Sequence, residues 1–558
     1  MIVTREESPS YKWMALSNTT LGMLAAAVNS SILLISLPAV FRGIGLKALD
    51  PANINYLLWA IIGYLIVTAV LVVTFGRLGD QFGRARMYNL GFAVFTVASV
   101  ALSLMPGQGA EAALYLIVVR IFQGIGGALI MANSTAILTD VFPPHERGLA
   151  LGVNMISAVA GQFLGLIIGG LLADTNWRLV FWINVPIGVV GTLWGFLKLR
   201  DRSSGVSHKF DLAGNLSFAI GLILILTAIT EGIQPYGNHV MSWASPRVLG
   251  CFAIGLVALI AFYFVENSVA RPMFDFRLFR IRSFAYGNVA SLLASVARGG
   301  LQFMLIIWLQ GIWLPLHGYS FEETPLWSAI FMLPLTIGLL LAGPISGYYS
   351  DHFGTRPFAV GGMLLSAISF AGLMTLPPDF SYLGFAVLIF VNGLGSGLFI
   401  APNSTQIMNS VPASERGQAS GMRATSLNAG TVLSIGIFFS LMLFGLAAML
   451  PYSMETSLLA EGVPSNIAHH VASAPPVASL FAAFLGYNPM AELLPPSALS
   501  IIAPANAATI TGKEFFPQLI SAPFMHGLRF AFAFSLALNV ISAVASWLGG
   551  KKFIYAAD

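Results

Sequence analysis

The sequence has little charge and almost no cysteine. Asp, Glu, Lys and Arg make up 9% of the 558 residues, 57% are hydrophobic, and the mean hydropathy is +0.81. A soluble fold of this length could not bury so much apolar surface, so we expect a lipid bilayer to surround most of the chain. The single cysteine, Cys251, excludes a disulfide within the chain and a cysteine-based metal cluster.

Motifs for chemical catalysis are also missing. The sequence has no Walker loop, no H-E-x-x-H pair and no His/Asp cluster inside its apolar segments. This argues against a nucleotide-driven pump and an enzyme, and we expect no cofactor and no metal. The inner loops are too short for the signalling domain of a receptor. The basic clusters at 198–209 and 271–282 are short loops between apolar segments, so nucleic acid is not an expected partner.

Apolar runs of about 20 residues can cross a bilayer as helices, and the chain has fourteen of them. Their approximate limits are 16–41, 56–75, 87–106, 112–138, 148–173, 179–198, 212–231, 247–265, 284–312, 325–347, 358–377, 381–408, 418–450 and 527–550. Lys and Arg are concentrated in the loops that share a side with both termini. By the positive-inside rule, this predicts a multi-pass protein of the plasma (cell) membrane with both termini cytoplasmic.

Residues 451–526 are apolar but are interrupted by prolines. The longest stretch without proline, 477–488, has 12 residues and is too short to cross. We predict one long external loop with short interfacial helices. Span 418–450 has 33 residues, more than a bilayer needs. We predict that it projects outward and that the loop packs on its tip.

A short motif occurs twice, each time after an apolar segment. Residues 76–86 read GRLGDQFGRAR, and residues 347–356 read GYYSDHFGTR. Three further matches follow at almost the same offset: 123–127 with 392–396, 133–135 with 403–405, and 146–148 with 415–417.

These repeats indicate a duplicated helical bundle. We predict a six-helix bundle in 1–200, two inserted membrane helices with basic cytoplasmic flanks in 201–282, and a second six-helix bundle in 283–558 that includes the loop 451–526.

The motif at 76–86 resembles the signature loop of the major facilitator superfamily, and residues 120–126, RIFQGIG, resemble its fourth-helix motif. Fourteen spans with a central extra pair resemble the 14-span drug:proton antiporter branch. The resemblance implies an all-α membrane protein with the major facilitator fold: two six-helix bundles plus two inserted central helices. It also implies a secondary active transporter that exports small hydrophobic or amphipathic compounds by alternating access, in exchange for protons. A duplicated bundle is complete as a monomer.

The resemblance implies a gate at the cytoplasmic side, where a charge clasp holds the two bundles together and then breaks. Its residues would be Gly76, Asp80, Gly83, Arg84, Asp351 and Gly354. In the copy Thr355 replaces the first arginine, so we expect a weaker clasp there. The alternative is that these residues only shape a turn.

Charged groups within a span are costly and usually functional. The resemblance places Arg120, with Gln123 and Gly124, facing the cavity in substrate or proton coupling; the alternative is an arginine bonded to backbone for structure. Arg298 is a second embedded cation and belongs to no motif. Asn29 stands where the branch commonly has an aspartate.

The fifth-helix motif of the branch is present without its proline, and its glycines form a close-packing face: Gly161, Gly165, Gly169 and Gly170. All Asp and Glu residues lie in loops or at span ends. Embedded arginines without embedded acids favour neutral amphipathic or anionic cargo over lipophilic cations. The alternative function is a specific exporter or uniporter of an endogenous lipid or metabolite without proton coupling.

Overall fold

Long apolar helices dominate the computed structural model, which describes residues 10–46, 51–143, 146–201, 211–234, 236–237, 239–269, 272, 274–412 and 415–549. In these residues every element is helical except one isolated bridge pair. Fourteen helices are long and apolar enough to cross a membrane, which confirms the predicted number. Helices suit this environment because they satisfy their own backbone hydrogen bonds.

The first half contains α1 (Ser10–Gly43), α2 (Pro51–Phe82), α3 (Arg84–Ser103), α4 (Gly109–Val141), α5 (Arg147–Thr175), α6 (Leu179–Trp182) and α7 (Asn184–Lys198), of which the last two form one span. The inserted pair is α8 (Leu212–Gly232) and α9 (Pro246–Ser268). The second half contains η1 (Phe276–Arg280), α10 (Arg282–Trp308), the π-helix η2 (Leu309–Trp313), α11 (Leu314–Leu316), α12 (Thr324–Phe331), α13 (Leu333–Phe353), α14 (Thr355–Thr375), α15 (Tyr382–Asn409), α16 (Arg416–Ala460) and α22 (Phe515–Leu548).

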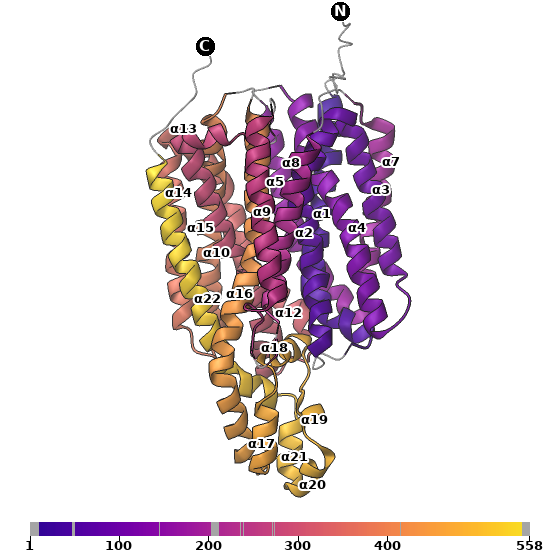
Figure 1. The fold of residues 1–558 in the computed structure, drawn as a ribbon, viewed down its shortest axis with the longest axis vertical. Coiled ribbons are helices and arrows are strands. Elements are labelled where there is room, and N and C mark those ends of the chain that lie inside the picture. Colours follow the sequence, from indigo (N-terminus) through magenta and orange to yellow (C-terminus); the bar gives the residue numbers. More distant parts are fainter. Residues whose placement is uncertain are drawn as a thin grey trace, which may run out of the picture.

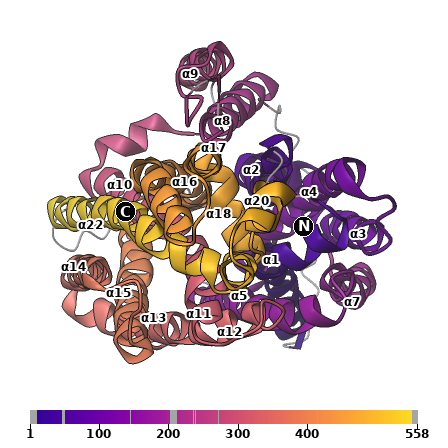
Figure 2. The same cartoon turned by 90° about the horizontal axis from the view of Figure 1, so that it is seen from below.

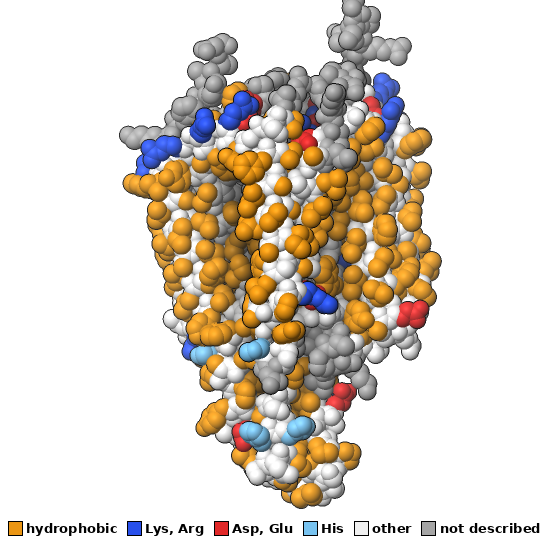
Figure 3. Space-filling view, in the orientation of Figure 1, with side chains coloured by type: hydrophobic (Ala, Val, Ile, Leu, Met, Phe, Trp, Pro, Cys, Tyr) orange, Lys and Arg blue, Asp and Glu red, His pale blue; other side chains and the backbone are white. Residues whose placement is uncertain are grey.

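The two ends of the molecule differ in charge and shape. Helix α1 begins and α22 ends at one end, here called the termini end, where Lys and Arg gather above a hydrophobic flank (Figures 1 and 3). The opposite end carries a projection, here called the extension, and is named the extension end. The extension contains α17 (Ser465–Ala472), α18 (Pro476–Leu485), α19 (Met490–Leu493), α20 (Pro496–Ile501) and α21 (Pro504–Thr511).

The inserted pair lies at the margin of the bundle, beside α2 and α16 (Figure 2). Glycine lets its two helices approach closely, since a Cβ on Gly221 would lie 3.1 Å from the carbonyl oxygen of Gly255. Thr74 of α2 donates to Asn215 of α8 at 2.8 Å. The pair therefore covers one side of the seam between the halves.

Helix α16 has 45 residues, about 67 Å at 1.5 Å per residue. It extends beyond the bundle and α17 packs on it, as the sequence predicted for this span. Two parts of the loop prediction are wrong. Helix α22 already begins at Phe515, because Pro517 falls in its first turn, where proline is tolerated. Helix α18 is not interfacial.

Helix α18 enters the bundle between the two halves (Figure 2). It meets α17 at an 82° bend, and all ten of its residues are buried. The reason is composition: VASLFAAFL is apolar on every face, and such a helix is stable only when it is surrounded.

Candidate functional site: the seam between the two halves

Helix α18 contacts both halves at the extension end. From the first half, Arg42 Nη1 donates to the carbonyl oxygen of Leu485 at 3.1 Å, at the C-terminus of α18, where a cation is favourable. From the second half, Phe303 of α10 lies 5.4 Å from Phe484, ring centroid to ring centroid. A Cβ on Gly311 of η2 would lie 2.5 Å from the carbonyl oxygen of Ala483, so only glycine fits against α18 there.

The halves also touch directly at this end. Gln310 Nε2 donates to the carbonyl oxygen of Ile35 in α1 at 3.3 Å and to Ser328 Oγ at 3.0 Å. Gly170 of α5 approaches Leu326 of α12, since a Cβ there would lie 2.7 Å from the Leu326 Cα. Gln310 lies in the π-helix η2, a local irregularity that often marks functional positions in long helices.

The aromatic cluster that follows Phe303 in the sequence is packed in the core in this structure. Trp308 is fully buried, with its ring centroid 4.6 Å from that of Phe380. Trp313 also stacks on Phe380, with a centroid distance of 5.1 Å. These side chains therefore close the extension end together with α18.

The side chains of α10 become fully buried where this helix reaches α18. From Phe303 to Pro315 every residue is buried, whereas Gln302 is half-buried and Arg298 is exposed. Arg298 lies in the middle of the membrane span Arg282–Leu316. Ala294, one turn before it, packs in a cluster with Phe399 of α15, so this face points into the second half rather than to lipid. Arg298, one turn after Ala294, therefore lies on the side of α10 that is turned toward the second half and is still accessible to solvent.

Arg298 has no hydrogen-bond or ion-pair partner among the described residues, and neither has Arg423 of α16. Arg423 is 9% exposed and its Nε is buried without a partner. The sequence analysis did not single out Arg423, which lies seven residues inside α16. A cation two turns into a helix is the signal that could have identified it.

Arg120 is held differently, inside the first half. It is 2% exposed, with its guanidinium 4.4 Å from the Tyr64 ring centroid. Its Nη1 donates to Gln123 Oε1 at 2.9 Å, and Gln123 Nε2 donates to Ser99 Oγ at 2.9 Å. Arg120 is thus buried among side chains of α2, α3 and α4, and its part in substrate or proton coupling stays a prediction. The sequence offered no signal for Tyr64.

Asn29 and Gly124 lie beside this network. Arg120 Nη1 is 3.5 Å from the carbonyl oxygen of Asn29, and Asn184 Nδ2 donates to Asn29 Oδ1 at 3.3 Å. A Cβ on Gly124 would lie 3.1 Å from the Tyr64 carbonyl oxygen, so a small residue allows α4 to approach α2. The polar core of the first half is thus built from neutral side chains around one arginine.

The glycines of α5 lie against α1. A Cβ on Gly161, Gly165 or Gly169 would come within 2.6 to 2.8 Å of a carbonyl oxygen of α1. Gly170, on the next face, contacts α12 instead. The glycine pattern therefore brings α1 and α12 close to α5 at the extension end.

The repeated motif forms a similar turn in both halves, with positive φ at Gly83 (105°) and at Gly354 (86°). Arg84 pairs with Asp80 at 2.7 Å and with Asp140 of α4 at 2.5 Å. These contacts of Arg84 join elements of the first half only. The clasp between bundles that the resemblance implied stays a prediction.

The remaining motif positions differ in what surrounds them. A Cβ on Gly76 would meet nothing within 4 Å, whereas one on Gly83 would lie 2.5 Å from the Asp201 carboxylate. In the copy, Thr355 Oγ1 is 3.4 Å from Gln406 Oε1, and the side chain of Asp351 lies outside the described residues.

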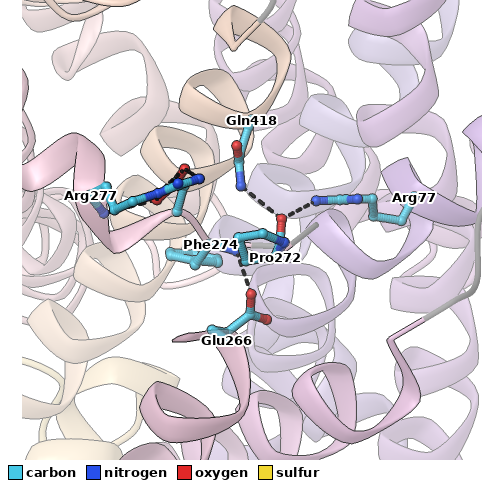
Figure 4. Close-up of polar contacts among 7 residues, drawn as sticks. Arg77, Glu266, Pro272, Phe274, Arg277 and Gln418 are labelled. Carbon is cyan, nitrogen blue, oxygen red and sulfur yellow. Dashed lines mark hydrogen bonds and ion pairs between the residues drawn. The ribbon is translucent and has the colours of Figure 1, made fainter. Parts of the chain in front are cut away.

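A link between the halves does exist near the termini end, through the segment after α9 (Figure 4). The carbonyl oxygen of Pro272 accepts from Arg77 Nη2 of α2 at 2.6 Å and from Gln418 Nε2 of α16 at 2.8 Å. The backbone N–H of Phe274 donates to Glu266 at 3.0 Å, which fixes this segment to α9. We name the three-residue arrangement of Arg77, Pro272 and Gln418 the Pro272 clasp.

The clasp is followed by an ion pair between Arg277 and Asp275, 2.7 Å apart. Hydrogen bonds from Arg277 hold the pKa of Asp275 below its usual value. Among the described residues there is no group of three or more His, Cys, Asp or Glu side chains that could hold a metal ion.

Comparisons with known proteins agree with this architecture. A family model described as the Major Facilitator Superfamily matches residues 19–435. The tetracenomycin C resistance and export protein of Streptomyces glaucescens is 28% identical over 96% of this chain and 91% of that protein. The riboflavin transporter RibZ of Clostridioides difficile is 27% identical (83% and 94%), and the methyl viologen resistance protein SmvA of Salmonella typhimurium is 30% identical (81% and 88%).

Solved structures show the same fold at low sequence identity. An inward-facing bacterial homologue of the human lysosomal transporter Spinster aligns over 97% of both chains, with a TM-score of 0.55 and 14% identity. The Escherichia coli xylose transporter XylE aligns over 77% of this chain and 90% of its own, with a TM-score of 0.50 and 16% identity.

Proposed function

The chain belongs to the major facilitator superfamily and is a membrane transporter rather than an enzyme, and on this premise we propose that it exports small hydrophobic or amphipathic compounds by alternating access. Relatives named for tetracenomycin C export and methyl viologen resistance support export. A relative named as a riboflavin transporter supports the alternative of a transporter for one specific compound.

The observation that carries the proposal is the unequal closure of the two ends. The extension end is closed by the buried helix α18 and by the Gln310–Ile35 contact, whereas the termini end is joined by the Pro272 clasp, two hydrogen bonds to one carbonyl oxygen. We propose that the termini end is cytoplasmic, because Lys and Arg gather there (Figure 3). Cargo would then enter from the cytoplasm and leave after α18 separates from one half. One chain suffices for this cycle.

We assign the two gates to different elements. At the outer side, α18 is the plug between the halves. At the inner side, the Pro272 clasp connects α2 to α16, while Asp80, Gly83 and Arg84 shape the turn that places Arg77. Gly354 would give the copy the same turn. Breaking two hydrogen bonds to one carbonyl is a small cost, as a gate that opens in each cycle requires.

Coupling to protons needs a group that titrates between the two sides. Among the described residues of the spans, no acid lies in the middle of a helix: Asp140, Glu231 and Glu266 all lie near helix ends. Asn29 replaces the acid of the antiporter branch. This favours the second candidate, a uniporter or exporter of one endogenous lipid or metabolite without proton coupling.

Transport by the purified protein in liposomes tests both candidates. A panel of neutral, cationic and anionic fluorescent compounds is offered with and without an imposed pH gradient. Export predicts movement of at least one amphipathic compound, faster in protein-containing vesicles than in empty ones. Acceleration by the gradient would favour antiport, and indifference to it would favour the uniporter. If no compound moves in either condition, the proposed export is wrong.

A matched pair of cysteine variants tests α18 as the outer plug. Cys251 is first replaced by serine, and one cysteine is then introduced at Ser479, buried in α18, or at Ser500, exposed in α20. The proposal predicts that a membrane-impermeant maleimide labels Ser479→Cys slowly and Ser500→Cys quickly, and that cargo speeds only the former. Equal fast labelling without cargo would contradict a closed plug.

A further inference from the structure

Arg298 is an internal cation without a counter-charge. We infer that it binds the anionic group of an acidic amphipathic cargo, such as an aromatic carboxylate, and that Arg423 is an earlier station on the same route. This rests on the proposed transport function and goes beyond it by naming the charge of the cargo.

The first argument is the lack of any partner. Arg298 pairs with no acid and donates no hydrogen bond among the described residues, although it lies in the middle of a membrane span. Arg120 shows what this chain does with a structural arginine: it stacks the guanidinium on Tyr64 and bonds it to Gln123. A charge in the middle of a membrane span is costly unless it is paired, so an arginine left without a partner there is best explained by a ligand that supplies one.

The second argument is position along the bundle axis. Gln310 contacts Ile35, and Arg298 lies 12 residues before Gln310, about 18 Å nearer the termini end. Asn29, which lies beside Arg120, is six residues before Ile35 in α1 and therefore about 9 Å nearer the termini end than Ile35. Arg298 is thus roughly 9 Å nearer the termini end than Arg120, on the cytoplasmic side of the α18 plug in the proposed orientation.

Arg423 lies further along the same direction. Gly430 of α16 packs on Leu292 and Ser295 of α10, which sets the register of the two helices. From this register, Arg423 lies roughly 16 Å nearer the termini end than Arg298. That distance is too long for one carboxylate to touch both. It suits two successive positions, with Arg423 five residues beyond Gln418 of the Pro272 clasp.

Polar and aromatic side chains near Arg298 could contact the uncharged part of an amphipathic molecule. Gln302, one turn further on, is half-buried and offers hydrogen bonds beside the guanidinium. Beyond it come the aromatic rings of Phe303 and Phe484 at the plug. An aromatic acid would place its carboxylate on Arg298 in the forked geometry that guanidinium favours, with its ring toward this apolar end.

Equilibrium binding to the purified full chain in detergent tests the inference without relying on transport. The probes are 2-naphthoate and its neutral analogue 2-naphthamide, which differ in charge but share the ring. We expect naphthoate to bind about tenfold more tightly than naphthamide. Arg298→Gln should remove this preference by weakening naphthoate about tenfold, with naphthamide changed less than about twofold; Arg298→Lys should retain part of the preference.

Arg282→Gln is the matched control, an exposed arginine at the start of the same helix, and should change neither affinity. Arg423→Gln should slow naphthoate uptake into liposomes while leaving its equilibrium affinity within about twofold. Arg298 has no contact to lose, so the variants should keep the thermal midpoint of wild type.

The inference is wrong if naphthamide binds as tightly as naphthoate, if Arg298→Gln weakens both equally, or if neither probe binds. The experiments distinguish a failure of this inference from a failure of the export proposal. Naphthoate that binds with the expected Arg298 dependence but is not transported would overturn export alone. A neutral dye exported equally by wild type and Arg298→Gln, without charge-dependent binding, would overturn only the inference.

Discussion

The arginines within the spans are held in opposite ways in the two halves. In the first half Arg120 is 2% exposed, stacked on Tyr64 and bonded to Gln123. In the second half Arg298 and Arg423 have no partner among the described residues. Both halves contain a turn with positive φ, at Gly83 and at Gly354, yet among the described residues only Arg120 of these three arginines has a stacking ring and a hydrogen-bond partner.

This difference separates a supporting role from a binding role. A guanidinium that stacks on a ring and donates to a neighbouring side chain, as Arg120 does, fixes the helices around it, because each contact constrains the planar group. An unsatisfied one is free to exchange water for a ligand. We therefore expect the first half to act as the rigid body and the second half to recognise charge.

The largest effect should come from Arg120→Gln. Losing the cation–π contact and the bond to Gln123 loosens the packing of α4 on α2, so transport of every compound should fall at least about tenfold. Arg120→Lys should not restore it, because an ammonium cannot stack as a plane on Tyr64. Arg298→Gln, measured in parallel in liposomes, should affect anionic compounds only.

Two outcomes would break the comparison. If Arg120→Gln reduced transport of anions but not of neutral compounds, Arg120 would be a binding residue despite its burial. If Arg298→Gln lowered the thermal midpoint as much as Arg120→Gln, Arg298 would be a structural residue.

The next effect concerns the repeated turns. Gly83→Ala and Gly354→Ala both place a Cβ at positive φ, which costs about 1–2 kcal/mol. Only Gly83 also meets the Asp201 carboxylate, at 2.5 Å from the added Cβ, whereas Gly354 meets nothing within 4 Å. Thermal unfolding should therefore show a larger loss for Gly83→Ala. Equal losses would mean that Asp201 moves aside freely.

These turns also show what the sequence could predict. The helices followed from apolar runs long enough to cross a bilayer, and the inserted pair followed from the offset between the repeats. The motif glycines predicted a tight turn, which the structure contains in both halves. Such features are local, since they depend on composition and on one backbone conformation.

Features that depend on contacts between distant segments were not predictable in the same way. Helix α18 has ten residues and is apolar all round, so length excluded a span and no periodicity showed what would cover it. Arg84 had two acids within reach, and the sequence could not show that Asp140 would be one of them. The Pro272 clasp uses a backbone carbonyl, which every residue has.

A smaller effect should follow from weakening the Pro272 clasp. Arg77→Gln or Gln418→Ala each removes one donor to the Pro272 carbonyl, at about 1 kcal/mol, so the balance between closed and open inner ends should shift about fivefold. Maleimide labelling of an introduced Ser426→Cys, half-buried in α16, should become faster from the termini side. Arg86→Gln, at an exposed arginine in the first turn of α3 that pairs with Asp201, should leave the labelling rate unchanged.

The smallest effect should be at Asp275, and only in acid. Because Arg277 lowers the pKa of Asp275 in the folded protein, the ion pair stabilises fully above the unfolded pKa of about 4. That contribution is lost as pH falls through the lower, folded pKa. The difference in thermal midpoint between wild type and Asp275→Asn should thus be constant from neutral pH to about pH 5 and shrink below about pH 4. Glu492→Gln, at an exposed acid in the extension, should lack this acid-range change. A difference that instead varied around neutral pH would show that another titrating group acts on the segment next to the clasp.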